Sequence, residues 1–576
     1  MVADVRAALT LLRNLLRLAL LPLWLVRRAI LRPRSRFVHV RLAASPVELP
    51  TPPTLWQRWL RRAEPEGLAS IDTLWRLARE VASDPAMDGV ALVIPRLTAG
   101  WATCTSVRDA LGWLRAQGKH VFVFLPLGGG QRELYVASAG TRVIAPPSST
   151  LWLLGAAAQG MYLKPLLDRL GVSAEVFSTG EYKTAAEALV RESMSDAQRE
   201  QLGALSETVQ RELEAALAER PGMDAARARA CFEGGFFSGI AAKELGLIDA
   251  CCYEDELGSE LGESRDKPRP RVRAGRYLAY RGLRLWRPLR HKAVVGVVAV
   301  HGAIVDSAPK RPQLSGRTGA SYESVSRALR AARLDPRVRA VILHIDSPGG
   351  SALASDLIHR ELTRLREKKT VIACMGNVAA SGGYYVAVGC ERIVAQPTTT
   401  TGSIGVISAR MLAAGLLERI GIRAEVVRSA PHADMFSPFR SLTDDERAML
   451  DDHVKDFYKT FLRVVAQGRA RTTDEIHALA RGRVWSGSDA HARGLVDVLG
   501  GLERAVSLVI EGVPELAKIA RNELVVRWIQ PPAGLAPIEP PTSAAQALLA
   551  EQGELLELLR DQGAALYYAS PPKLGS

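Results

Sequence analysis

Short apolar runs that end in glycine-rich turns recur along the second half of the chain. Residues 341–345 read as a buried strand, and a turn with one proline and two glycines follows at 346–351. Residues 370–375 form a second such run, which is followed by a turn of small residues and a helix-compatible segment. Adjacent parallel strands that lead into helices place their turns at one sheet edge, where ligands bind. The pattern therefore predicts an α/β fold with a functional edge.

The second of these turns, residues 379–383, holds a lone serine among residues of almost no side-chain volume. A nucleophile needs such a setting, with an exposed oxygen and backbone N–H groups free to face an oxyanion. Gly382 and Gly383 allow close approach to Ser381, and the turn at 346–351 can supply a further amide. We interpret Ser381 as a candidate nucleophile. The alternative is a small-residue turn that only packs a helix onto the sheet.

A nucleophilic serine needs a base, and none of the ten histidines falls in a comparable motif. His344 lies inside a predicted strand and His301 at the end of another, so an arrangement of serine, histidine and aspartate with either one stays open. A lysine is the other candidate base. It can serve only where desolvation lowers its pKa toward neutrality.

The chain contains an internal repeat. The matching pairs of segments are, in order, 135–147 with 385–397, 170–176 with 420–426, and 237–249 with 485–497. Such an ordered set at a nearly constant offset predicts two α/β domains of one fold in tandem.

The two repeats differ where chemistry is expected. Gln131 stands at the position of Ser381, so the first repeat lacks a nucleophile. The first repeat has Lys183 instead, and the equivalent position in the second repeat is Ala433. Each half thus has what the other lacks. This complementary loss favours Lys183 as the base over its ordinary interpretation as a solvated surface lysine.

These motifs together resemble the signal peptide peptidase A family in its long, duplicated form. That family consists of membrane-associated serine–lysine peptidases with an α/β fold related to Clp protease and crotonase. The matching segments run in family order across roughly residues 80–500, and they are 182–187, 346–351, 379–384, 401–405 and 482–487.

The resemblance implies a role for each matched residue. Ser381 would be the nucleophile, Lys183 the general base, and Ser403 the hydroxyl that holds the lysine amine in place. The oxyanion-hole N–H groups would come from Gly382 together with Gly349 or Gly350. The chain departs from the family at Ala188, where proline is frequent, and at Asp346, where asparagine is frequent; neither change removes one of these groups.

The resemblance also implies a function. We expect a serine endopeptidase that hydrolyses short apolar peptides such as released signal peptides, needs no metal or other cofactor, and forms a homo-oligomer, a tetramer in the family. Two alternatives stay open, a catalytically inactive scaffold that binds membrane proteins and a crotonase-like acyl-CoA enzyme. The latter would not need the pair Ser381 and Lys183.

The composition of the chain indicates which kinds of binding partner to expect. The formal charge of +14, from 75 basic and 61 acidic residues, favours an anionic surface. No basic motif with interleaved aromatic residues is present, so we expect lipid rather than nucleic acid. The six cysteines show no metal-ligand spacing and are expected to be reduced thiols, at positions 104, 231, 251, 252, 374 and 390.

The N-terminus, residues 1–36, predicts an amphipathic helix. Its longest uncharged run, residues 18–26, has nine residues, whereas a spanning helix needs ~20. Arginines fall on one narrow face and leucines cover the rest, which is typical of a helix that lies in a membrane interface. A tilted spanning helix over residues 7–26 is the alternative. We expect the chain at the bacterial inner membrane. If the helix spans it, the arginines that follow favour a cytoplasmic catalytic part, whereas the family often places that part outside, so the side stays open.

These observations divide the chain into five parts. The predicted parts are a membrane helix at 1–36, an α/β domain with the lysine at 37–262, a basic linker at 263–292, an α/β domain with the serine at 293–515, and a tail at 516–576.

Overall fold

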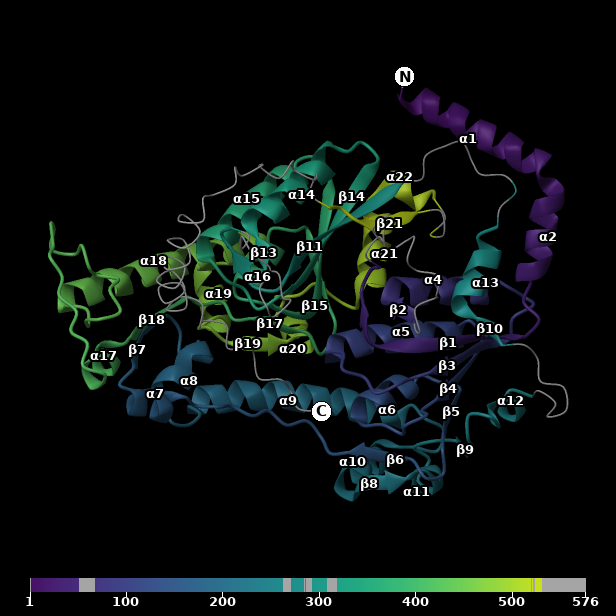
Figure 1. Cartoon of the computed structure of the whole chain (residues 1–576), viewed down its shortest axis with the longest axis horizontal. Helices are drawn as coiled ribbons and strands as arrows, with labels where there is room; N and C mark the ends of the chain where they lie inside the picture. The colour runs from purple at the N-terminus through teal and green to yellow at the C-terminus, as the bar shows by residue number, and fades with distance from the viewer. Residues whose placement is uncertain are drawn as a thin grey trace.

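The computed structural model of the chain describes residues 2–50, 68–262, 271–283, 285, 293–307, 319–519, 521 and 524–530. The structure contains two main sheets, one from each half of the chain, with helices packed between and around them (Figure 1). The first sheet is parallel, and the second is parallel except for the pair β17 (Thr400–Gly402) and β19 (Val484–Ser486). The predicted tandem of two α/β domains is thereby confirmed.

The first sheet has the strand order β10-β1-β3-β4-β5-β9, with β2 paired to β1, and every pair is parallel. The strands are β1 (Phe37–Val47), β2 (Leu68–Ser70), β3 (Gly89–Val93), β4 (His120–Phe124), β5 (Arg142–Ala145), β9 (Ala250–Cys251) and β10 (Val272–Arg273). The helices α4 (Ile71–Ala82) and α5 (Trp101–Ala116) connect the first strands. Both carry buried apolar residues that join one core with the strands.

The second sheet has the order β19-β17-β15-β14-β11-β21, and β16 pairs with β15 and β20. The strands are β11 (Val294–His301), β14 (Val338–Ser347), β15 (Thr370–Ala380), β16 (Arg392–Ala395), β17 (Thr400–Gly402), β19 (Val484–Ser486), β20 (Val498–Leu499) and β21 (Val525–Trp528). The two apolar runs of the sequence, 341–345 and 370–375, lie in β14 and β15, which pair in parallel as predicted.

Helices cover both faces of this second sheet. The helices are α14 (Tyr322–Leu334), α15 (Ala352–Arg366), α16 (Gly382–Ala387), α18 (Asp444–Arg469) and α21 (Leu502–Gly512). Apolar side chains of α14, α15 and α16 join one face, and those of α21 join the other. Because both faces are covered, the central strands are apolar without alternation.

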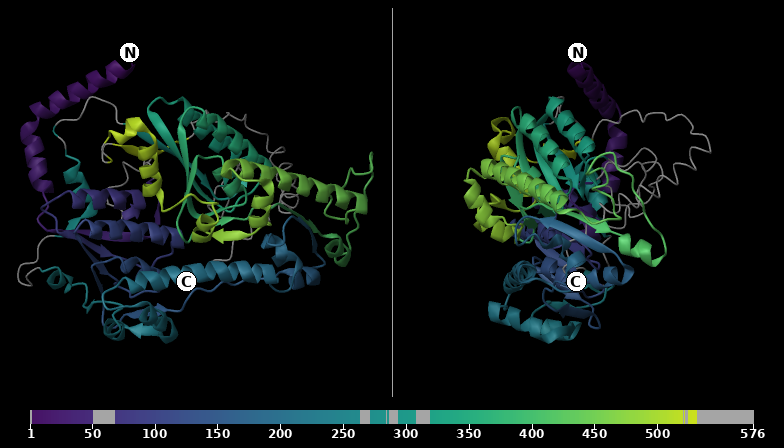
Figure 2. Two further views of the ribbon diagram at one scale, coloured as in Figure 1. Left: turned by 180° about the vertical axis from the view of Figure 1, so that it is seen from behind. Right: turned by 90° about the vertical axis from the view of Figure 1, so that its left-hand side faces the viewer.

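The two halves are joined by direct contacts. β7 (Ser173–Ser178) of the first half pairs antiparallel with β18 (Ile407–Leu412) of the second. The long helix α9 (Asp196–Ala218) runs beside the second half, and its Thr208 hydroxyl donates to Ser486 Oγ at 3.3 Å (Figure 2). Arg79 on α4 forms an ion pair with Glu503 on α21, with N–O at 2.7 Å. The first half is therefore positioned to contribute residues to a site in the second.

Two segments that we predicted as connectors also contribute structure. The predicted linker contains β10 and α13 (Ala274–Arg281), and β10 pairs with β1. The predicted tail contains β21, which completes the edge of the second sheet beside β11. Open strand edges accept such short partners because their N–H and C=O groups are unpaired. Most of the remaining residues of the predicted linker and tail, among them 531–576, lie outside the described residues.

The predicted N-terminal helix is divided in two, α1 (Val2–Ala19) and α2 (Leu21–Leu31), and it projects from the body (Figure 1). The break lies at Leu20, and Pro22 stands in the first turn of α2, where its missing N–H costs nothing. Across the described residues, no helix combines the length and the apolar character needed to cross a membrane.

Candidate active site

Ser381 occupies a sharp turn between β15 and α16. Its φ is 53° and its ψ is −120°, a conformation that costs a non-glycine residue about 1–3 kcal/mol. The turn is held on both sides, because Ser381 N donates to Gly402 O at 2.8 Å and Tyr385 N donates to Ser381 O at 2.9 Å. Such a turn lifts the Ser381 side chain out of the sheet edge, and the residue stays partly exposed.

The turn after β14 packs directly against the Ser381 turn. Gly349 has φ 103°, and a Cβ atom there would lie 2.7 Å from Gly382 N and 2.8 Å from Ser381 Cβ. Only glycine allows this approach. The N–H of Gly349 donates to Ser347 Oγ at 3.1 Å. Among the described residues, the N–H groups of Gly350 and Gly382 donate to no acceptor, so these two are the amides that can receive an oxyanion.

Lys183 reaches this turn from the first half of the chain. Its Nζ lies 3.1 Å from Ser381 Oγ, 2.9 Å from Ser403 Oγ and 2.9 Å from Ser403 O. The side chain is only 8% exposed. Burial lowers the pKa of the Lys183 amine to about 7, since charge is unfavourable away from water. The amine is therefore partly neutral at physiological pH and can accept a proton.

The loop that carries Lys183 is fixed to the second half by backbone contacts. Beyond the β7–β18 pairing, Thr179 N donates to Val406 O at 3.0 Å and Tyr182 N to Arg481 O at 2.9 Å. A Cβ atom at Gly482 would lie 2.5 Å from Lys183 N, so the two loops meet where a side chain has no space. These contacts explain why the motif at 482–487 accompanies the lysine motif in the sequence.

Ser403 follows β17 with φ 52°. Its N–H donates to Arg483 O at 2.7 Å, and β17 itself pairs with β15, the strand that ends just before Ser381. Both the hydroxyl and the carbonyl of Ser403 accept from Lys183. The sequence indicated the hydroxyl; the carbonyl has no side-chain signal and was missed.

The two histidines considered as alternative bases, His301 and His344, hydrogen-bond to each other rather than to Ser381. His301 Nε2 and His344 Nδ1 share a hydrogen bond of 2.7 Å with each other. In the part of the chain that the structure describes, neither ring bonds to Ser381. Burial lowers the pKa of both rings. The structure thus brings Ser381 together with Lys183 and Ser403, and not with a histidine.

The equivalent turn of the first half is closed by its own side chains. Gln131, at the position of Ser381, donates from Nε2 to Gly155 O at 2.8 Å and accepts from Gly155 N at 2.9 Å. The Glu133 carboxylate accepts from Gly130 N at 2.7 Å and from Leu97 N at 2.5 Å. Glu133 thus occupies the Gly130 amide in the turn and the Leu97 amide beside it, and Gln131 stands where the second half has its serine, so this turn offers no nucleophile.

Two polar residues of the segment 346–351 support the Ser381 turn, a role that the sequence did not assign to them. Ser347 Oγ accepts from Gly349, as described above, and Asp346 Oδ1 accepts from Val378 N at 3.0 Å. All six cysteines are unpaired. No group of three or more His, Cys, Asp or Glu side chains in the described ranges is arranged to hold a metal ion.

Comparison with known proteins adds an independent line of evidence. A sequence model of peptidase family S49 matches residues 115–266 and 363–513, one match in each half. The chloroplastic serine protease SPPA of Arabidopsis thaliana is 33% identical over 454 residues, which is 77% of this chain and 66% of that protein. Protease 4 of Salmonella typhi is 33% identical over 460 residues, 77% of this chain and 72% of that protein.

A shorter relative matches part of the chain. The putative signal peptide peptidase SppA of Enterococcus faecium is 34% identical over 210 residues, 36% of this chain and 60% of that protein. Two family matches in tandem and the long alignments with proteases agree with the duplicated fold. The chain belongs to peptidase family S49 and is a serine peptidase built from two copies of the family domain.

Proposed function

We propose that the chain is a membrane-associated serine endopeptidase in which Ser381 is the nucleophile and Lys183 the general base. One observation carries the proposal. The Lys183 amine, buried and with a pKa lowered to about 7, lies 3.1 Å from Ser381 Oγ. A base of this pKa at hydrogen-bond distance matches what a serine hydroxyl needs for attack near neutral pH.

The reaction follows from this geometry. The neutral Lys183 amine takes the proton of Ser381 Oγ as the oxygen attacks a peptide carbonyl. The oxyanion receives hydrogen bonds from the N–H groups of Gly350 and Gly382, and the Lys183 ammonium gives its proton to the leaving amine. Water, deprotonated by Lys183, then hydrolyses the acyl-enzyme. The two Ser403 oxygens hold the amine in line throughout.

We infer that its substrates are short apolar peptides such as released signal peptides. The support is the resemblance of the catalytic motifs to the signal peptide peptidase A family and the relative of that name in Enterococcus faecium. No metal or other cofactor takes part in the proposed reaction.

The N-terminal helices support association with an anionic membrane surface, which we place at the bacterial inner membrane. Their apolar side chains are largely exposed, as expected for a surface that contacts lipid. The exposed residues are Leu11, Leu12, Leu15, Leu16, Leu18, Leu20, Leu23, Leu25, Val26 and Ile30. Pelleting with vesicles that contain about one-third anionic lipid tests this; equal recovery in the supernatant with and without vesicles contradicts it.

Self-association is the second partner interaction that we infer. The segment between α17 (Ala414–Arg419) and α18 projects from the second half and exposes apolar side chains, with Val427 fully exposed and Phe436 78% exposed (Figure 2). Exposed apolar clusters mark contact surfaces. Light scattering of the detergent-solubilised chain measures the oligomer, and a monomer at micromolar concentration contradicts it.

A serine-reactive fluorophosphonate probe tests the catalytic assignment. The wild-type chain should become covalently labelled at Ser381, located by peptide mass spectrometry, and Ser381→Ala should not be labelled. Gln131→Ala, which changes the equivalent turn of the first half, is the matched control and should be labelled as wild type. Absence of labelling, under conditions where a related peptidase reacts, would leave the scaffold alternative in place.

A further inference from the structure

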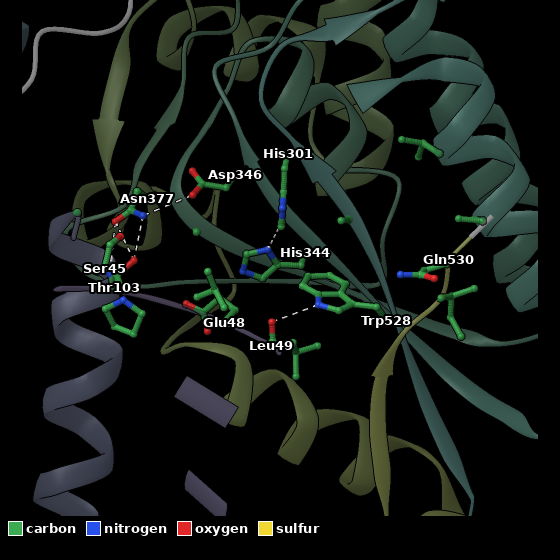
Figure 3. Close-up of a pocket in the computed structure, with 18 of the residues that line it drawn as sticks. Ser45, Glu48, Leu49, Thr103, His301, His344, Asp346, Asn377, Trp528 and Gln530 are labelled. Carbon is green, nitrogen blue, oxygen red and sulfur yellow. Dashed lines mark hydrogen bonds between the residues drawn. The ribbon is translucent and has the colours of Figure 1, made fainter. Parts of the chain in front are cut away.

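A cavity of about 490 Å³ lies where the two halves meet, beside the second sheet (Figure 3). It is lined by residues 45–49 at the end of β1 and just after it, by the start of α5, by α14, and by residues of β11, β14, β15 and β21. Neither Ser381 nor Lys183 lines it. Its volume falls in the ~300–1,000 Å³ range of small-molecule sites, and the proposed function does not use it.

Three aromatic rings form one corner of this cavity. The rings of His301 and His344 have centroids 4.9 Å apart and planes at 80°. Trp528 lies 5.5 Å from His301 at 87° and 6.0 Å from His344 at 83°. The Trp528 ring is fixed, because its Nε1 donates to Leu49 O at 3.3 Å. The rings are mutually perpendicular, an arrangement in which ring faces of negative potential can surround a cation.

The ionisable side chains of the cavity, apart from its histidines, are all carboxyl groups. Glu48 and Asp346 both line it, and no arginine or lysine is among its described lining residues. Asp346 is already used, since Oδ1 accepts from Val378 N at 3.0 Å and Oδ2 from Asn377 Nδ2 at 3.4 Å. Glu48 Oε2 is buried and has no hydrogen-bond partner in the described part of the chain. An anionic ligand would meet two carboxyl groups and no cation.

A second buried atom also lacks a partner. His344 is only 3% exposed, and its Nδ1 is bonded to His301. Its Nε2 has no partner among the described residues. Figure 3 shows His344 between Glu48 and Trp528 in the middle of the cavity. Buried polar atoms are almost always hydrogen-bonded, so two that are not, on one cavity, indicate a missing polar ligand.

We propose that this cavity binds an organic ammonium or guanidinium group, with the Glu48 carboxylate as its counter-ion and the Trp528 ring as its aromatic wall. The group belongs either to a small amine or to the N-terminus of a peptide. The site is separate from the proposed catalytic pair, and its occupancy does not depend on Ser381.

The protonation states of the cavity make binding depend on pH. Burial, together with the nearby carboxyls of Asp346 and Asp72, raises the pKa of Glu48 to about 8. At pH 7 Glu48 therefore carries a proton, and a bound cation displaces it. Burial lowers the pKa of His344 and His301, so both rings are neutral and do not repel a cation. The affinity for a cation that keeps its proton should therefore rise as the pH rises from 6 to 9, whereas an α-amino group, whose ordinary pKa is about 8, loses its charge in the upper part of this range.

The full chain with Ser381→Ala, which removes turnover, tests the charge preference. Titration calorimetry at pH 8.5 compares benzylammonium, its neutral analogue benzyl alcohol, and the anion benzoate. Benzylammonium should saturate one site and bind at least about tenfold tighter than either analogue, consistent with a cation–aromatic contact beside a carboxylate. Equal affinities, or no saturable binding of benzylammonium, would overturn the proposal.

Variants locate the site. Glu48→Gln keeps the shape and removes the charge, so it should weaken benzylammonium about tenfold and abolish the pH dependence. Trp528→Leu should weaken it about 3- to 30-fold. Trp113 lies on α5 outside the cavity lining. Trp113→Leu is therefore the matched control, and it should leave the affinity for benzylammonium unchanged. If Trp528→Leu does not fold, Glu48→Gln decides alone, and unchanged affinity in that variant contradicts the site.

Competition identifies the source of the cation. A short apolar peptide with a free N-terminus is added to the Ser381→Ala chain with bound benzylammonium, beside the same peptide with an acetylated N-terminus. Displacement only by the free peptide assigns the site to peptide N-termini. Displacement by neither peptide assigns it to small amines. Equal displacement by both peptides shows that charge is not recognised and overturns the proposal.

Discussion

The same turn exists twice in this molecule, open in the second half and closed in the first. At 379–383 the serine stands alone among small residues, and the neighbouring N–H groups of Gly350 and Gly382 donate to nothing in the described chain. At 129–133 the side chains of Gln131 and Glu133 occupy four backbone groups. The backbone fold alone therefore does not make a site. A site also needs a turn whose side chains leave the backbone groups around it free.

At the position of the lysine, the first half has the functional residue and the second half has lost it. Lys183 of the first half is buried between the halves, whereas Ala433, its equivalent, is exposed on the projecting segment before α18. A lysine amine at the exposed position would keep its ordinary pKa, because solvent stabilises its charge. The proposed nucleophile therefore lies in one half and the proposed base in the other, and neither half alone contains both.

The largest expected effect comes from removing the base. Lys183→Met should lower kcat on a peptide substrate by at least about 10³-fold, because the Ser381 hydroxyl is a poor nucleophile without a proton acceptor. The thioether fills the buried space, so thermal unfolding should stay cooperative. If Lys183→Met keeps activity within a few-fold of wild type, Lys183 is not the base, and a histidine becomes the candidate again.

Closing the open turn should be the next largest effect. Gly349→Ala places a Cβ atom 2.7 Å from Gly382 N and must displace the Ser381 turn. We expect kcat to fall about 10²–10³-fold, the usual result of losing an oxyanion donor. Steady-state kinetics measure this, and fluorophosphonate labelling of Ser381 should slow as well. If Gly349→Ala is as active as wild type, the Ser381 turn tolerates an added side chain, and the contrast with the turn at 129–133 does not explain activity.

Ser403→Ala should have a smaller effect. The lysine amine then keeps its contact with the Ser403 carbonyl at 2.9 Å and loses only the hydroxyl. An unsatisfied buried donor costs about 1–3 kcal/mol, which corresponds to about a 5- to 150-fold drop in turnover. Turnover is compared with wild type and Ser381→Ala on one peptide. Equality with Ser381→Ala would make Ser403 essential, and equality with wild type would reduce it to packing.

The pH profile tests burial of the base directly. Because only the neutral amine accepts a proton, kcat/KM should rise about tenfold per pH unit below 7 and level off above it, with the midpoint at the Lys183 pKa of about 7. A midpoint above pH 9 would contradict a desolvated lysine.

The same pKa affects stability. The folded-state pKa of Lys183 lies below its unfolded value of about 10.5, so between these values the unfolded state binds more protons. The free energy of unfolding should therefore rise with pH from about 7 to 10.5, and this contribution should vanish in Lys183→Met. Denaturant titrations of both chains across that range measure the difference.

The smallest expected effect on activity lies in the closed turn. Gln131→Ala leaves Gly155 N–H and C=O without their buried partners, so unfolding should become easier by about 1–3 kcal/mol while kcat changes less than about twofold. Gln131→Ser in a Ser381→Ala background should show no turnover, because no lysine of the described first half hydrogen-bonds to that turn. Turnover there would mean that the closed turn is still competent.

Part of this site could be predicted because its signals are local. Apolar runs and glycine turns indicated β14 and β15 and the Ser381 turn, since each depends on residues adjacent in sequence. The repeat made Lys183 visible through its replacement at Ala433. In contrast, β10 and β21 were missed because strands of two and four residues carry little periodicity and form only where a sheet edge accepts them.

The sequence by itself determined the duplicated α/β fold and which half holds the serine and which the lysine, because apolar periodicity, glycine turns and repeat alignment are properties of the chain. Only the tertiary structure decided that the two meet. Ser381 and Lys183 are 198 residues apart, and their contact depends on β7 pairing with β18 and on the close approach at Gly482. The lowered pKa of Lys183 follows from the same packing, since desolvation comes from neighbours that no local pattern reveals.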